Sequence, residues 1–386
     1  MSEWKRYKLS DIASLSNGIN FDKSAYTSGV KLIGVADFKD RIYPDFNSLQ
    51  EVDPKVVRKG DYLEKGDIVF VRSNGNKELV GRCMMIDQDI PVTYSGFCIK
   101  LRLMDKNIFE PIFFNYLFRT RQFRKAMTGT AVGANIQNLS QSRLGNCKVC
   151  VPNIEKQREI ATILSRYDSL IENYQKQIKL LEEAAQRLYK EWFVDLHFPG
   201  HEHTKIVNGV PEGWEKKKVG DMISKIQRTK QVTTNNYQAS GKIPVIDQSR
   251  NYIAGYTDDA ECLVKVTVPY IVFGDHTRIL KYIPFSFAKG ADGTQLIMSN
   301  DLERMPQTLF YNSLIEIDLS NYSYARHFKY LKEEFVLLPS EYIARKYDSI
   351  VSRYYQSIQK SREQIRLLTE ARDRLLPKLM SGEIAV

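Results

Sequence analysis

A stretch of 35 residues occurs twice in this chain, and this repeat limits what the chain can fold into. In its first copy, residues 158–192, apolar side chains return at alternating steps of four and three, with mostly charged and amide side chains between them. The apolar positions are Ile160, Leu164, Tyr167, Ile171, Tyr174, Ile178, Leu181, Ala185, Leu188 and Trp192. A heptad seam sustained over about four and a half heptads predicts a long helix that packs along one stripe against another helix.

The second copy begins 187 residues later, without a gap. Residues 165–167 return as residues 352–354, and Pro152 before the first helix matches Pro339 before the second. The second seam contains Val351, Tyr354, Ile358, Ile365, Leu368 and Leu375. Two unrelated coiled-coil helices would share a period but not these identities at one offset, so we infer an internal duplication with pseudo-twofold symmetry.

Two polar residues interrupt the second seam. Ser361 and Arg372 stand where the first helix has Tyr174 and Ala185. Polar residues on a seam usually cost stability and can fix the register of the pair. This favours pairing of the two helices within one chain over a homodimeric zipper.

Each helix is preceded by a globular part. Residues 4–12, which begin at a Trp, are echoed 210 residues later by residues 214–222. Residues 193–213 are rich in Pro, Gly and His and have no period, so they are interpreted as a linker. The predicted domains are 1–152, a central helix 153–195, a linker and second globular domain 196–339, and a final helix 340–386.

Short β-like runs dominate both globular parts. We predict strands over 67–72, 92–101, 269–274 and 314–317, and short helices over 113–117 and 310–314. The expected fold class is α+β: two mixed α/β globular domains separated by two long antiparallel coiled-coil helices, with a pseudo-twofold internal repeat.

The two long helices would also set the distance between the two globular domains. A helix of about 33 residues spans roughly 50 Å, and two such helices can lie antiparallel only if the globular domains sit at opposite ends. On B-DNA, two domains so spaced would contact patches roughly one to one and a half turns apart. Such a protein is expected to read a split, asymmetric target around an unread spacer.

The charge of the chain agrees with a DNA partner. It has 56 Lys and Arg against 46 Asp and Glu, a formal net charge of +10, which favours a polyanionic ligand. Polar and basic side chains in loop-like segments are the candidates for contacts with bases and phosphates. In the first half these are Arg72, Ser73, Asn74, Asn76, Lys77, Arg82, Thr130, Asn135, Gln137 and Asn138; in the second half they are His276, Thr277, Arg278, Lys281, Thr294, Arg326, His327 and Lys329.

Signals for catalysis or metal binding are weak. Asp275 beside His276 suggests acid–base chemistry, but no nucleophile or third partner lies nearby in sequence. The lone Cys147 and Cys150 pair is read as part of a strand rather than a zinc site. The chain has no GxGxxG, no GxxxxGK[ST] and no Pro-Pro. We therefore predict no catalytic residues, no metal site and no cofactor.

Location is inferred from hydropathy and cysteine content. No window approaches ~18 uninterrupted apolar residues, and the N-terminal residues lack an apolar signal segment. Five scattered cysteines suit a reducing compartment. The sequence thus predicts a cytoplasmic protein that does not enter a membrane.

These features together resemble the specificity subunits of Type I restriction-modification enzymes. The resemblance covers essentially the whole chain and rests on the duplicated helices, the Trp-x4-Leu/Val-x-Asp pattern at each domain start, and three further strings. These are Trp192–Asp195 leading to Pro211–Trp214, Phe273–Arg278, and Ala325–Lys329. The first half has no counterpart of the Gly-Asp-His-Thr-Arg string at 274–278.

The resemblance implies a non-catalytic subunit that recognises double-stranded DNA. Its two globular segments would be target recognition domains, and its helices would form the spacer and dock two methyltransferase subunits; a restriction translocase subunit is left open. The assembled enzyme would use S-adenosylmethionine, ATP and Mg²⁺, none of which should bind this chain. Two alternatives remain: a coiled-coil protein adaptor without DNA readout, and a self-contained DNA methyltransferase or nuclease with unrecognised motifs.

Overall fold

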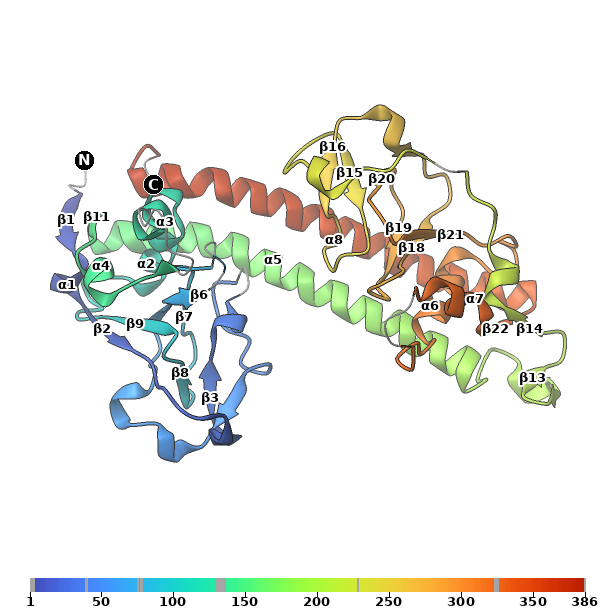
Figure 1. Cartoon of the computed structure of the whole chain (residues 1–386), viewed down its shortest axis with the longest axis horizontal. Coiled ribbons are helices and arrows are strands. Elements are labelled where there is room, and N and C mark those ends of the chain that lie inside the picture. The colour runs from blue at the N-terminus through green and yellow to red at the C-terminus, as the bar shows by residue number, and fades with distance from the viewer. Residues whose placement is uncertain are drawn as a thin grey trace. The chain divides into compact units, whose positions relative to one another are not determined.

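The chain folds into two units that share its two long helices. The structure is a computed structural model and describes residues 4–38, 41–74, 76, 79–128, 137–227, 229–322 and 326–384. Unit 1 comprises Met1–Asn173 and Ile365–Val386, and unit 2 comprises Tyr174–Gln364. Helices α5 (Ile154–Tyr189) and α8 (Glu341–Ser381) therefore each contribute one end to each unit (Figure 1).

Both predicted long helices are present. The Asn153 side chain accepts a hydrogen bond from the backbone N–H of Lys156 at 3.0 Å, a typical helix N-cap after Pro152. Within unit 2, Arg362 of α8 contacts Glu182 of α5 at 2.9 Å, and the hydroxyl of Tyr347 donates to the carbonyl of Ala185 at 3.2 Å. Residue numbers thus rise on one helix as they fall on the other, which confirms the antiparallel pairing.

The predicted seam faces protein rather than solvent. Its buried members are Ile160, Leu164, Ile171, Ala185, Trp192, Val351 and Ile358, and its half-buried members are Tyr167, Tyr174, Ile178, Leu181, Leu188, Tyr354, Ile365, Leu368 and Leu375. Both polar interruptions are also covered, because Ser361 is buried and Arg372 forms an ion pair with Asp168 of α5. This agrees with pairing of the two helices within one chain.

Unit 1 is built around a central strand with four consecutive buried residues. This strand, β5 (Ile68–Val71), pairs antiparallel with β7 (Cys83–Met85) on one side and β9 (Cys98–Leu103) on the other, and β2 (Ala13–Asn17) completes the sheet. A second sheet has the order β4 (Gln50–Val52), β3 (Tyr26–Ile33), β8 (Val92–Tyr94), with β3 and β8 parallel. Helix α2 (Pro111–Arg119) packs on β7, and its Phe113, Phe114 and Phe118 join Ile160 and Leu164 of α5 in one hydrophobic core.

Unit 2 repeats this topology. Strand β18 (Tyr270–Gly274) lies between β19 (Leu280–Ile283) and β21 (Thr294–Ile297), as β5 lies between β7 and β9. Strand β15 (Ile243–Ile246) is parallel to β20 (Phe287–Lys289) and antiparallel to β16 (Gly255–Thr257), as β3 is to β8 and β4. Helix α6 (Gln307–Ile315) takes the place of α2. The duplication therefore includes the globular parts, whose sequences have diverged.

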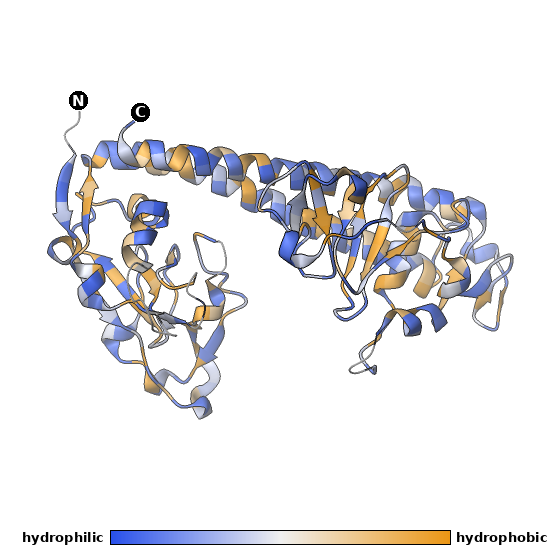
Figure 2. Cartoon of the chain, turned by 45° about the horizontal axis from the view of Figure 1, so that its top comes forward, coloured by the Kyte–Doolittle hydropathy of each residue, from blue (hydrophilic) through white to orange (hydrophobic). Residues whose placement is uncertain are grey.

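Each unit is closed by a pair of strands next to a long helix. In unit 1, β1 (Lys5–Lys8) pairs with β11 (Lys148–Val151); in unit 2, β14 (Glu215–Lys218) pairs with β22 (Phe335–Leu338). The remaining α-helices and strands are α1 (Leu9–Ile12), β6 (Ser73–Asn74), α3 (Arg121–Thr128), β10 (Gln137–Asn138), α4 (Gln141–Gly145), β12 (Ile206–Val207), β13 (Val210–Pro211), β17 (Leu263–Val264) and α7 (Phe328–Glu333). Figure 2 shows hydrophobic stretches in the strands and an alternation of hydrophobic and hydrophilic residues along α5 and α8.

Two strand predictions were wrong in detail. Residues 314–317 are not a strand, because Leu314 and Ile315 end helix α6, whose apolar side chains are buried on several sides. The run 92–101 is two strands, β8 and β9, separated by a turn at Ser95–Phe97. That turn includes Gly96, where a Cβ would lie 2.1 Å from the Asn20 side chain. The predicted helices at 113–117 and 310–314 and the strands at 67–72 and 269–274 are confirmed.

The aperiodic segment 193–213 is more ordered than a simple linker. Phe193 and Phe198 are buried, and the Phe198 ring lies 4.6 Å from the Trp214 ring between centroids. Strands β12 and β13 form a hairpin in the same segment. Aromatic packing therefore joins this segment to unit 2, and the sequence does not reveal it because the aromatic residues follow no helical or strand period. Cys150 lies within β11, as expected, whereas Cys147 directly precedes this strand.

Candidate nucleic-acid interface

Three loop segments meet at one end of the central sheet of unit 1. The backbone N–H of Arg72, directly after β5, donates to the carbonyl of Phe97 at 2.8 Å, and the carbonyl of Arg72 accepts from the N–H of Leu139 at 2.8 Å. Strand β6 pairs with β10 in register Asn74 to Gln137. Two sequence-predicted groups that lie more than 60 residues apart are thus brought together.

Unit 2 has the same backbone arrangement. The N–H of Asp275, directly after β18, donates to the carbonyl of Gly293 at 2.7 Å, and the carbonyl of Asp275 accepts from the N–H of His327 at 2.9 Å. Arg72 and Asp275 therefore occupy equivalent positions, although their sequences share nothing. The first half does have a structural counterpart of the 274–278 string, in the turn that begins at Arg72.

The segments of unit 1 present polar side chains around an exposed aromatic residue. Arg72, Ser73, Asn74 and Arg82 are half-buried, and Asn76 and Asn138 are exposed. A guanidinium nitrogen of Arg72 donates to the carbonyl of Gly96 at 3.3 Å. The Phe97 side chain is 63% exposed. It is not among the candidate contacts chosen from the sequence, because it lies within the predicted strand 92–101. Lys77, Thr130 and Asn135 lie outside the described residues, and only the backbone of Gln137 is described.

In unit 2 the exposed part of the string is His276, Thr277 and Arg278. Gln248, which no sequence pattern singled out, holds this turn: its side-chain oxygen accepts from the His276 N–H at 3.0 Å, and its carbonyl accepts from the Thr277 hydroxyl at 2.7 Å. The Gln248 amide also donates to the Asp292 carbonyl at 2.9 Å, so it joins two loops.

A further polar group lies next to this turn. Arg326 and Lys329 are exposed, and the Lys329 ammonium lies 4.6 Å from the centroid of the Tyr330 ring. The Tyr330 ring stacks on Tyr322 with centroids 4.0 Å apart. These side chains add cationic and aromatic surface to the segment that carries His327.

Three other candidates of unit 2 are buried. The two ring nitrogens of His327 lie 2.9 and 2.8 Å from the carbonyls of Asp275 and Tyr322, and the Thr294 hydroxyl donates to the Ala291 carbonyl at 3.0 Å. The carboxylate of Asp275 accepts from the Phe328 N–H at 2.8 Å, so it is not poised beside His276 for acid–base chemistry. Lys281 is 4% exposed. The polar atoms of His327, Thr294 and Lys281 contact backbone carbonyls, so these side chains hold the loops in place and are not assigned to contacts with DNA bases.

Burial of Lys281 leads to a prediction about stability. Its ammonium donates to the carbonyls of Asp247 and Asn251, and desolvation lowers its pKa from 10.5 to about 8. Between these pH values the unfolded chain keeps a proton that the folded chain has lost, so the free energy of unfolding should rise with pH. Relative to Lys281→Met, the wild type should gain at most about 3 kcal/mol between pH 8 and 10.5 in urea unfolding.

The exposed Lys329 provides the control. Lys329→Met removes a cation from the same unit at a site open to solvent, so it controls for the loss of one positive charge without burial. A Lys281→Met difference that does not change with pH would mean that the Lys281 ammonium is solvated in the folded state.

Among the described residues, no group of three or more His, Cys, Asp and Glu side chains could hold a metal ion. No helix formed by these residues has the length and hydropathy of a membrane span.

Known proteins resemble this chain in sequence and fold. Residues 1–183 match the family model of the Type I restriction modification DNA specificity domain. The type I restriction enzyme MjaIX specificity subunit of Methanocaldococcus jannaschii is 27% identical over 299 residues, 70% of this chain and 68% of that protein. The putative MjaX specificity subunit of the same organism is 25% identical over 291 residues, 69% of this chain and 67% of that protein.

A solved structure supports the fold. The S subunit of a Type I restriction-modification system from M. genitalium aligns over 98% of this chain and 96% of its own, with a TM-score of 0.60 and 17% sequence identity. The chain is therefore similar to type I restriction enzyme specificity subunits, through the match of residues 1–183 to the family model and over 70% of its length to the relative from Methanocaldococcus jannaschii.

Proposed function

We propose that this chain is the non-catalytic specificity subunit of a type I restriction-modification complex and reads double-stranded DNA with two different surfaces. The observation that carries the proposal is the pair of equivalent loop junctions, at Arg72 in unit 1 and Asp275 in unit 2. Each junction fixes the backbone by internal hydrogen bonds and leaves polar or cationic side chains exposed at its rim. Such side chains are the ones that contact base edges and phosphates.

The proposal includes a bipartite target. The two junctions share a backbone arrangement but, among the described residues, expose different side chains: Asn76 and Asn138 in unit 1, and His276, Thr277 and Arg278 in unit 2. Two such surfaces would select two different short blocks. Because α5 is one continuous helix of 36 residues, we assign to the helices the constant spacing between the blocks and the docking of two methyltransferase subunits.

Selection from a library of random duplexes tests this function. The full chain, alone and together with its methyltransferase subunits, should enrich two fixed blocks separated by an unread spacer of constant length. Affinity should fall with salt with a slope of about −0.9 per phosphate contacted on a log–log plot. Enrichment of one continuous block would contradict two independent readers, and failure to retain any DNA with the subunits present would contradict the function itself.

A further inference from the structure

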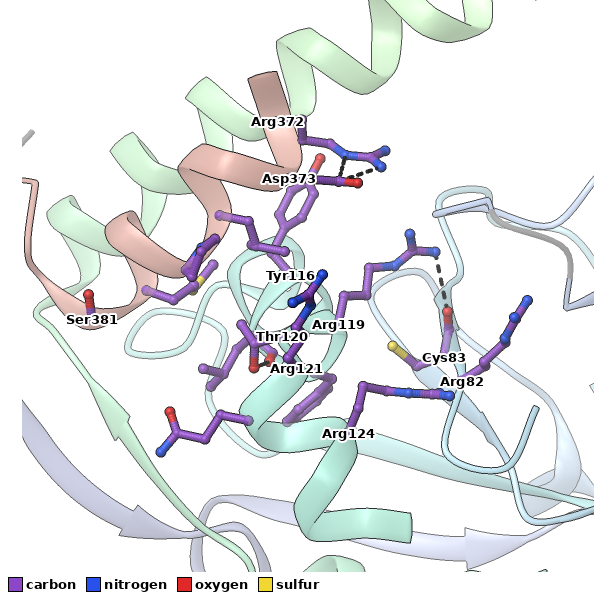
Figure 3. A pocket seen from close by; sticks show the side chains of 16 residues that line it. Arg82, Cys83, Tyr116, Arg119, Thr120, Arg121, Arg124, Arg372, Asp373 and Ser381 are labelled. Atoms are coloured by element: carbon purple, nitrogen blue, oxygen red, sulfur yellow. Dashed lines mark hydrogen bonds and ion pairs between the residues drawn. The ribbon is translucent and has the colours of Figure 1, made fainter. Parts of the chain in front are cut away.

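Unit 1 contains a cleft of about 830 Å³ whose lining is rich in arginine. The end of α2, the start of α3, the start of β7 and the last turns of α8 form its walls. The charged residues in this lining are Arg82, Arg119, Arg121, Arg124, Arg372 and Asp373. Figure 3 shows the side chains of Arg119, Arg121 and Arg124 projecting from the α2–α3 segment of this cleft.

The acidic groups at this cleft are already paired with one of the arginines. Asp373, the one acid in the lining, accepts hydrogen bonds from Arg372 at 3.0 and 2.8 Å, and Asp168 forms an ion pair with the same guanidinium. Arg119 donates to the backbone carbonyls of Arg41 and Cys83, which are uncharged partners. The described lining contains five arginines and one aspartate, which is a formal surplus of positive charge.

The duplicated fold does not require these arginines. Phe113 and Asn115 of α2 match Phe310 and Asn312 of α6, which places Glu316 where unit 1 has Arg119. At the repeat offset of 187, Arg372 corresponds to Ala185. Helix α3 has no counterpart, because the described residues between α6 and α7 contain no helix. The cationic lining is thus an addition to unit 1, and like charges gathered in a cleft favour an anionic ligand.

We propose that this arginine cleft binds a segment of the DNA phosphate backbone beside the reading surface of unit 1. The inference rests on the proposed function and deepens it. Arg82 lies in the cleft wall, and its carbonyl accepts from the N–H of Val71, the residue directly before Arg72, at 2.9 Å. Guanidinium groups bind phosphate oxygens through paired hydrogen bonds, which position a protein on a duplex without reading sequence.

Arg121 and Lys125 provide a matched pair for the test. Both side chains are exposed, both lie on α3 and both carry one positive charge, but only Arg121 lines the cleft. Binding of the full chain to a labelled duplex of random sequence is measured by fluorescence anisotropy across a salt series. We expect Arg121→Gln to reduce the log–log salt slope by about 0.9 and the affinity at 0.1 M salt by about five- to ten-fold. Lys125→Gln should change neither, and Arg121→Lys should retain the slope.

The results of this experiment distinguish a failure of the cleft proposal from a failure of the proposed function. Equal losses for Arg121→Gln and Lys125→Gln would mean that a diffuse surface field attracts the DNA, and the cleft proposal would be wrong. An unchanged slope for Arg121→Gln would also overturn it, while sequence-selective binding by the wild type would leave the proposed function standing. Should the variant bind DNA normally but assemble poorly with the methyltransferase subunits, the cleft would be a protein-docking site instead.

Discussion

Replacement of Asp168 with alanine is expected to lower the free energy of unfolding of the chain by about 3 kcal/mol. Asp168 is 8% exposed, and in unit 1 it joins three elements: it lies on α5, pairs with Arg372 of α8 and accepts a hydrogen bond from the Tyr116 hydroxyl of α2 at 2.6 Å. Without this carboxylate, a largely buried guanidinium and a buried phenol lose their shared partner, and neither regains full hydration. Urea unfolding of the full chain at neutral pH, followed by circular dichroism, measures the loss.

Asp373 is the control for this variant. Its carboxylate also contacts Arg372, but its side chain is 59% exposed, so Asp373→Ala should cost less than about 1 kcal/mol. Similar losses for the two variants would contradict the role assigned to Asp168. Asp168→Asn should fall between them, because the amide oxygen still accepts from Tyr116 while the charge opposite Arg372 is gone.

Exchange of residues 214–339 for the corresponding segment of a relative with a different target should change one block of the DNA target and leave the other intact. Strands β14 and β22 pair at the two ends of this segment, and the junction of Asp275, Gly293 and His327 lies within it. The imported segment therefore brings its own closing strands and its own loop contacts. Each base pair that it no longer reads costs about 1–3 kcal/mol, so the affinity for the original target should fall at least about a hundred-fold.

The target of the hybrid can be determined by the same duplex selection, with the methyltransferase subunits present. The reciprocal exchange of residues 4–151, closed by β1 and β11, should change only the other block. A hybrid in which both blocks change would show that the two surfaces do not read DNA independently, even if each variant folds.

The sequence determined the elements whose signals are local or repeated. A heptad period sustained over about four and a half heptads, with Pro152 and Pro339 before the two helices, was enough to predict α5, α8 and their pairing. Continuous apolar runs were enough for β5 and β18, because strands buried on both faces have no polar alternation. The loop candidates were predicted as groups, since polar and glycine residues between apolar runs mark the ends of strands.

Only the tertiary structure decided which loop residues meet and which remain exposed. The equivalence of Arg72 and Asp275 lies in backbone hydrogen bonds, which do not depend on the identity of the side chain, so the two sequences were free to diverge. Lys281 and His327 are of residue types that commonly contact DNA, but both are buried. No sequence pattern pointed to Gln248 or Phe97 as parts of the loop surfaces. Burial depends on contacts between segments far apart in the chain, and the pairing of Asp168 with Arg372, 204 residues apart, is of the same kind.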